Sequence, residues 1–176
     1  MIYRELSPSE YDLLKTFLYE AIFIPEGVTP LDRSIIELPE LKLYYDNFGS
    51  GKADVCVVAE DECGVVGAAW SRIMDDYGHI DDDTPSLAMS VMPDHRGQGI
   101  GTNLLQELIT LLGEKGYKKA SLSVQKANYA VRMYERAGFR TIRDSDDEYI
   151  MVCDLLNESE FNDIDDIHDP CLRFQR

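Results

Sequence analysis

Residues 95–102, His-Arg-Gly-Gln-Gly-Ile-Gly-Thr, carry the strongest chemical signal in the chain. They follow an extended apolar run over residues 86–92 that stops at Pro93. They precede apolar residues with helical spacing from Ile100 to Leu112. This pattern predicts a strand, a glycine-rich turn and the start of a helix. The backbone N–H groups of such a turn lack partners, and the helix dipole adds partial positive charge there. We therefore expect the turn to bind a pyrophosphate.

The turn is not a dinucleotide-binding fingerprint. That fingerprint requires the spacing G-x-G-x-x-G. Counting from Gly97 places Thr102 at the third glycine position, and counting from Gly99 places Leu104 there. Both counts fail, which excludes this class of site.

A second glycine-rich segment, residues 49–53, imitates the end of a nucleotide triphosphate-binding loop. It lacks the first glycine of that loop and the Ser or Thr that should follow Lys52, and a strand-like run comes after it. We interpret it as a plain loop. The pattern that remains is Arg-x-x-Gly-x-Gly, formed by Arg96, Gly99 and Gly101.

At these three residues the chain resembles the GNAT superfamily of acyl-CoA-dependent N-acetyltransferases. The resemblance is strong from Leu87 to Phe139 and weaker over residues 1–156. Further matching positions follow in the same order and spacing: Ser121, Leu122, Ser123, Val124, Asn128, Ala130, Tyr134, Gly138 and Phe139. The resemblance implies an α/β (α+β) fold with a mixed, mostly antiparallel central sheet, flanking helices and a V-shaped opening at the central strand. It divides the chain into an acetyltransferase domain (1–156) and an acidic C-terminal tail (157–176).

The resemblance also implies a coenzyme A site. N–H groups of the turn should hold the pyrophosphate, Arg96 should shape the front of the turn, and Asn128 should meet the pantetheine while capping a helix. A backbone N–H near the centre of residues 89–91, at a β-bulge, should polarise the thioester carbonyl. The expected cofactor-binding residues are Met89, Ser90, Val91, Arg96, Gly97, Gln98, Gly99, Ile100, Gly101, Thr102 and Asn128. Lys126, Arg132 and Arg136 are candidates for the 3′-phosphate.

The implied chemistry is direct attack of an amine on acetyl-CoA, without a covalent enzyme intermediate. Tyr134 stands where the family places its general acid, and it should protonate or hydrogen-bond the departing thiolate. The base is undefined, because the central strand over residues 87–92 carries no Asp, Glu or His. His79, Glu60, Asp83 and a chain of water molecules all remain candidates.

The net charge of the chain limits the classes of molecule that it can bind. The net charge of −16 argues against nucleic acid and against an anionic membrane surface. The charge is unevenly distributed, because residues 96–143 hold nine of the 17 Lys and Arg but three of the 33 acidic residues. The basic segment contains the predicted phosphate turn. The acidic remainder, including the loop over residues 75–84, could attract a cationic amine.

Length and composition fit one domain with a proper core. No run is apolar enough to span a membrane, and the N-terminus has no signal-peptide pattern, so we expect a cytoplasmic protein. The four cysteines lack metal-site spacing; we expect reduced thiols and no metal. A homodimer is possible.

The expected elements alternate strands and helices. Strands are expected at residues 2–6, 55–60, 65–74, 87–92, 120–124, 139–143 and 148–155. Helices are expected from Pro8 to Ala21, around 34–36, from Pro39 to Gly49, at 99–114 and at 129–137.

Three hypotheses on function follow. The first is acetyl transfer from acetyl-CoA to a primary amine of a cationic acceptor, such as a polyamine, an aminoglycoside-like amine, a lysine side chain or a peptide N-terminus. The second is an acyl-CoA-binding sensor or partner module without turnover. The third is transfer of a longer acyl or an aminoacyl group.

Overall fold

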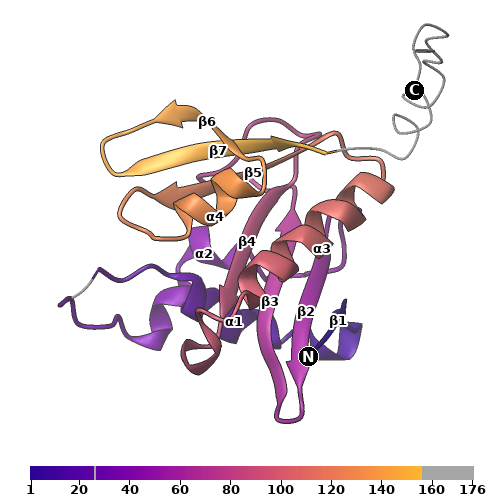
Figure 1. The fold of residues 1–176 in the computed structure, drawn as a ribbon, viewed down its shortest axis with the longest axis vertical. Helices are drawn as coiled ribbons and strands as arrows, with labels where there is room; N and C mark the ends of the chain where they lie inside the picture. Colours follow the sequence, from indigo (N-terminus) through magenta and orange to yellow (C-terminus); the bar gives the residue numbers. More distant parts are fainter. Residues whose placement is uncertain (26, 156–176) are drawn as a thin grey trace, which may run out of the picture.

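The computed structural model describes residues 1–25 and 27–155, which form a seven-stranded sheet in the order β1-β2-β3-β4-β5-β7-β6 (Figure 1). The strands are β1 (Ile2–Glu5), β2 (Val55–Asp61), β3 (Gly64–Arg72), β4 (Ser86–Val91), β5 (Lys119–Gln125), β6 (Arg140–Asp144) and β7 (Glu148–Asp154). The helices are α1 (Leu13–Ala21), α2 (Pro39–Lys42), α3 (Ile100–Glu114) and α4 (Val131–Arg136), with 3-10 turns η1 (Pro8–Glu10), η2 (Arg33–Glu37) and η3 (Pro93–His95). The predicted mixed, mostly antiparallel sheet is confirmed.

The sheet is open between β4 and β5. Every other neighbouring pair is antiparallel and runs over at least four register positions. The parallel pair β4–β5 is in register at a single position, Ser86 with Ser121. The two strands thus meet at their N-terminal ends and separate toward their C-terminal ends, which is the V-shaped opening that the resemblance implied.

The opening does not arise from a bulge in β4. The register of β3 with β4 runs without a shift from Gly67–Val91 to Arg72–Ser86. Register shifts occur instead in the β2–β3 pair, after Ala59, and in the β6–β7 pair. The prediction of a bulge at residues 89–91 is therefore wrong. The physical cause of the opening is that β5 leaves β4, while β4 stays fully paired with β3.

Two apolar layers cover the sheet. One joins α3 and α4 to the face that carries Leu87 and Met89 of β4. The other joins α1 and the segment after α2 to the face that carries Ala88 and Trp70. Alternate side chains of a strand point to opposite faces, so odd-numbered β4 residues face α3 and even-numbered ones face α1. Any molecule that reaches from one face to the other must cross the opening.

Several helix boundaries differ from the expectation. The first helix was expected from Pro8, but η1 comes first and α1 begins at Leu13; the Ser7 N–H donates to the Glu10 carboxylate (3.0 Å), as in a capping box. α2 has only four residues, and turns replace the predicted helix up to Gly49. The tail over residues 157–176 lies outside the described residues. Within them, no helix is long and apolar enough to cross a membrane.

Arg72 explains why the chain turns after α2 instead of continuing as a helix. Its guanidinium donates to the carbonyl oxygens of Leu43 (2.9 Å) and Asp46 (2.7 Å), groups that a longer helix would use internally. It also forms a two-pronged ion pair with Asp54 (3.0 and 3.1 Å), and the two side chains are only 11% and 3% exposed. This pair fixes the segment over residues 43–54 to β3.

We predict that Arg72→Ala lowers the free energy of unfolding by about 3–5 kcal/mol, because it leaves the Asp54 carboxylate buried without its partner. Urea unfolding measures the change. The matched control is Arg140→Ala, which breaks the exposed Arg140–Asp154 pair (55% and 60% exposed) and should cost less than about 1 kcal/mol. Equal losses in the two variants would contradict the role assigned to Arg72.

Candidate active site

The turn before α3 has the geometry of an anion cradle. Gly97 (φ 74°) and Gly99 (φ 81°) adopt the left-handed conformation that side chains disfavour, and Gly99 is the N-cap of α3. The first backbone bond that enters the helix is Asn103 N–H to Gly99 O (3.2 Å). Among the described residues, no acceptor meets the N–H groups from Gly97 to Thr102. This row of free donors at a helix N-terminus suits an anion.

Gly101 has a different role from Gly97 and Gly99, because its missing side chain allows close packing. A Cβ atom at Gly101 would lie 3.3 Å from Met89 Cε and 3.5 Å from Met133 Sδ. The first turn of α3 therefore lies directly against β4 and α4. The predicted turn, the central strand and the helix of Tyr134 meet on one face of the sheet.

Arg96 holds the turn in place. Its Nε donates to Val91 O (2.8 Å), and its Nη2 donates to the backbone and the carboxylate of Glu20 (3.3 and 3.2 Å). The guanidinium thus ties the turn to β4 and to the C-terminal part of α1. His95 adds a second tether, because its Nε2 lies 3.1 Å from Asp61 Oδ2 on β2.

The backbone of β4 presents two N–H groups to the opening. Met92 N–H donates to Val66 O (2.8 Å), so by antiparallel alternation the N–H of Ser90 also points to β3. The N–H groups of Met89 and Val91 then point toward β5, beyond the one position where β5 pairs. The Val91 carbonyl on that side is taken by Arg96. Of these two residues, Val91 is the last of β4, whereas Met89 lies nearer the middle of the strand.

Ser90 is not part of this donor site, contrary to the expectation. Its N–H points to β3, and its Oγ donates to Phe17 O of α1 (2.7 Å) on the opposite face. The sequence pattern could not separate Ser90 from Met89 and Val91, because strand register decides which way each N–H points.

Tyr134 lies on α4, half-buried against the same apolar layer as Met89. Its ring packs edge-on against Phe139, with 5.8 Å between ring centroids. Burial raises the pKa of the Tyr134 phenol well above its usual value, and Tyr129 adds to this. The hydroxyl thus stays protonated at neutral pH, which suits a hydrogen-bond donor to a thiolate.

The other residues expected to contact the cofactor differ in their bonding and exposure. Asn128 Oδ1 accepts from Ala130 N–H (2.9 Å), which forms a local turn just before α4, whose N-cap is Ala130. Lys126 is engaged in an ion pair with Asp144 and lies over the Tyr149 ring. Arg132 and Arg136 are exposed on α4. Lys126 is thus already paired with a carboxylate, whereas the two arginines are exposed.

The three candidate bases do not come together. Glu60 pairs with Arg4 (2.7 Å) at the β1–β2 edge, two strands from β4. His79 Nδ1 lies 3.0 Å from Met74 O, and Asp83 is exposed. A different acid, Asp76, binds Tyr44 and Ser86 beside the closed end of the opening. In the sequence, Asp76 is one of several acids in the loop over residues 75–84.

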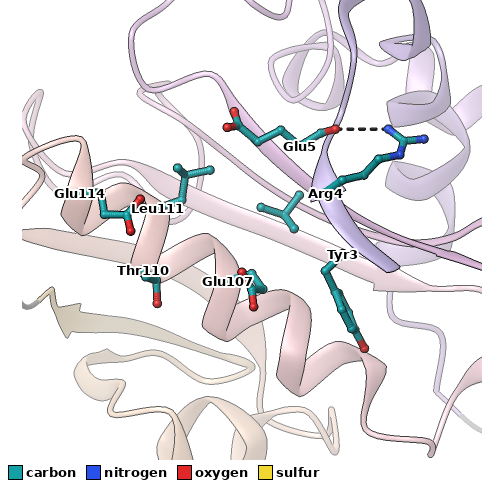
Figure 2. Close-up of a pocket in the computed structure, with 8 residues that line it drawn as sticks. Tyr3, Arg4, Glu5, Glu107, Thr110, Leu111 and Glu114 are labelled. Carbon is teal, nitrogen blue, oxygen red and sulfur yellow. Dashed lines mark hydrogen bonds between the residues drawn. The ribbon is translucent and has the colours of Figure 1, made fainter. Parts of the chain in front are cut away.

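One surface groove lies away from these residues. It has a volume of about 180 Å³ and runs between β1 and α3, lined by Tyr3, Arg4, Glu5, Val57, Glu107, Thr110, Leu111 and Glu114 (Figure 2). Figure 2 shows Glu107 and Glu114 along α3 facing the β1 residues. None of the donor-site residues contributes to it, and it is small for a cofactor site.

The family comparison covers the greater part of the chain. Residues 19–139 match the acetyltransferase (GNAT) family. A mycothiol acetyltransferase of Propionibacterium freudenreichii subsp. shermanii is 38% identical over 88 residues, which are 49% of this chain and 28% of that protein. The match thus spans well under half the length of that curated relative.

Solved structures share the fold. The ribosomal-protein-S18-alanine N-acetyltransferase of Escherichia coli aligns with a TM-score of 0.61 at 19% identity, over 88% of this chain and 93% of that one. The acetyltransferase yncA of Salmonella typhimurium, solved with acetyl-CoA, aligns with a TM-score of 0.63 at 19% identity, over 89% and 95%. A phosphinothricin acetyltransferase of Sinorhizobium meliloti, also in complex with acetyl-CoA, gives 0.61 at 19% over 88% of each chain. With its open sheet, its glycine-rich turn before α3 and the match over residues 19–139, the chain belongs to the acetyltransferase (GNAT) family.

Proposed function

We propose that this protein transfers an acetyl group from acetyl-CoA to a primary amine of a cationic acceptor, by direct attack within a ternary complex. The observation that carries the proposal is the row of N–H groups from Gly97 to Thr102 that find no acceptor in the described part of the chain, at the wide end of the opening between β4 and β5. Two structures of the same fold contain acetyl-CoA, which supports this donor.

Acetyl-CoA fits the α3–α4 face of the sheet in one direction. The pyrophosphate binds the turn, with Arg132 or Arg136 near the 3′-phosphate, and Asn128 lies along the pantetheine. The thioester then enters the opening, where Met89 N–H donates to its carbonyl oxygen as negative charge develops. Because β4 is fully paired with β3, the Met89 N–H is held rigidly.

Tyr134 acts at the sulfur. When the C–N bond forms and the C–S bond breaks, the leaving thiolate gains a hydrogen bond from the Tyr134 hydroxyl. Because burial raises the pKa of that phenol, full proton transfer to sulfur is uphill, and the principal contribution is the hydrogen bond to the developing charge. The amine nitrogen supplies the proton that ends on the sulfur, so the sum is an amide, free coenzyme A and one released proton.

The turn is tested by Gly99→Val. A β-branched side chain at a φ of 81° forces the turn to relax and misaligns the donors, so affinity for coenzyme A should fall at least about tenfold by calorimetry. Gly116→Val is the matched control, since Gly116 (φ 89°) also has open space around a Cβ and lies at the other end of α3. Unchanged affinity in Gly99→Val, or equal weakening in both variants, would refute the phosphate turn.

Tyr134→Phe tests the leaving-group role. Removal of the hydroxyl should lower kcat about 100-fold, because the thiolate loses its donor, and leave coenzyme A affinity within about twofold. Tyr117→Phe, on the same apolar layer but beyond the far end of α3, should keep the wild-type rate. An unchanged rate in Tyr134→Phe removes this residue from the mechanism.

Thiol release from acetyl-CoA, measured against a panel of amines, tests the activity itself. Spermidine, an aminoglycoside, Nα-acetyl-lysine and a peptide with a free α-amino group cover the acceptor classes suggested by the acidic loop. Release with at least one amine is expected. Tight coenzyme A binding without release on any of them would favour the alternative function of an acyl-CoA-binding sensor.

A further inference from the structure

A hydrogen-bonded cluster lies on the sheet face opposite the donor site. Asp76 Oδ2 accepts from the Tyr44 hydroxyl (2.8 Å) and from Ser86 Oγ (2.7 Å). The Tyr44 carbonyl in turn accepts from the indole N–H of Trp70 (3.1 Å), a side chain with no exposed surface. The Asp76 carboxylate is thereby attached to the core and to the first residue of β4.

The cluster lies at the closed end of the opening. Ser86 is the one β4 residue in register with β5. A Cβ atom at Gly78, two residues after Asp76, would lie 2.6 Å from Ser86 Oγ and 3.1 Å from Ser123 N. The loop that carries Asp76 therefore crosses the seam of the two strands. Ser86 and Ser123 alternate with residues of the α3 layer, so this cluster faces the α1 side.

One oxygen of Asp76 has no donor. Oδ1 is buried and meets no hydrogen-bond partner among residues 1–25 and 27–155. A buried, unsatisfied carboxylate oxygen costs free energy that a charged donor would recover. Asp76 belongs to a bend between β3 and β4, outside the paired strands.

A second acidic side chain lies near the cluster. Glu148 of β7 lies across the seam, where its Oε2 accepts from Ser123 Oγ (3.1 Å). Burial and then the charge of Asp76 raise the pKa of the Tyr44 phenol, with smaller contributions from Tyr77 and Glu148. Tyr44 thus stays a donor to Asp76 at neutral pH. Two carboxylates on either side of one seam favour a cation between them.

We propose that Asp76 binds the ammonium group of the acceptor, with Oδ1 as its hydrogen-bond acceptor and Tyr44 and Ser86 holding Oδ2. The substrate class is a primary amine that arrives protonated on the α1 face and meets the donor through the opening. The inference rests on the proposed function for the identity of the donor, whereas amine binding can be measured by itself.

The test uses the full chain saturated with coenzyme A and titrated by calorimetry with spermidine, an aminoglycoside, Nα-acetyl-lysine and a peptide with a free α-amino group. Wild type should bind at least one probe, and Asp76→Asn should weaken that binding about tenfold or more. Asp75→Asn, the exposed neighbour in the same loop, is the matched control and should bind as wild type. Coenzyme A affinity and the unfolding midpoint should be unchanged in both variants.

The outcomes separate this inference from the proposed function. Wild type that binds no probe, Asp76→Asn that binds as wild type, or equal weakening by Asp75→Asn each overturns the ammonium site. If Asp76→Asn unfolds early, Tyr44→Phe replaces it and should still weaken amine binding more than coenzyme A binding. If the wild-type protein binds an amine through Asp76 but releases no thiol from acetyl-CoA, the ammonium site stands and the proposed transferase activity is overturned.

Discussion

The separation of β5 from β4 is the constraint on which the rest of this structure depends. Backbone N–H groups in a sheet interior normally find a partner in the next strand. Here the pairing ends after Ser86 and Ser121, so the Met89 N–H is left facing a gap. The layout of the site follows from that gap. The glycine-rich turn before α3 lies at its wide end, Tyr134 belongs to the apolar layer on one face, and the Asp76 cluster lies on the other face at the closed end.

The scaffold holds the gap open from both sides. The unbroken β3–β4 pairing keeps β4 straight, and β7 pairs along the whole of β5. Arg96 occupies the Val91 carbonyl, which faces the gap and has no strand partner. Arg72 and Asp54 fix the segment that carries Tyr44. Charged side chains thus satisfy backbone groups that the open sheet and the short α2 leave free.

The sequence was sufficient for the parts that depend on local chain geometry. Gly97 and Gly99 must adopt positive φ, and the apolar spacing after them admits only a helix, so the turn and α3 were predictable. Features set by contacts between distant residues were not. The direction of the Ser90 N–H depends on strand register, the length of α2 depends on Arg72, and Lys126 is occupied by Asp144. Asp76 stood among several acids of one loop, and only the fold shows that it reaches Tyr44 and Ser86.

The central claim is that the donor lies along the turn and places its thioester at Met89 N–H. Backbone amide chemical shifts, followed by NMR during titration with coenzyme A and then with acetyl-CoA, test it directly. The amides from Gly97 to Thr102 should shift with both ligands. The Met89 amide should distinguish the two, because only acetyl-CoA brings a carbonyl oxygen to it. Unmoved turn amides, or a Met89 amide that responds equally to both ligands, would rule out this mode of binding.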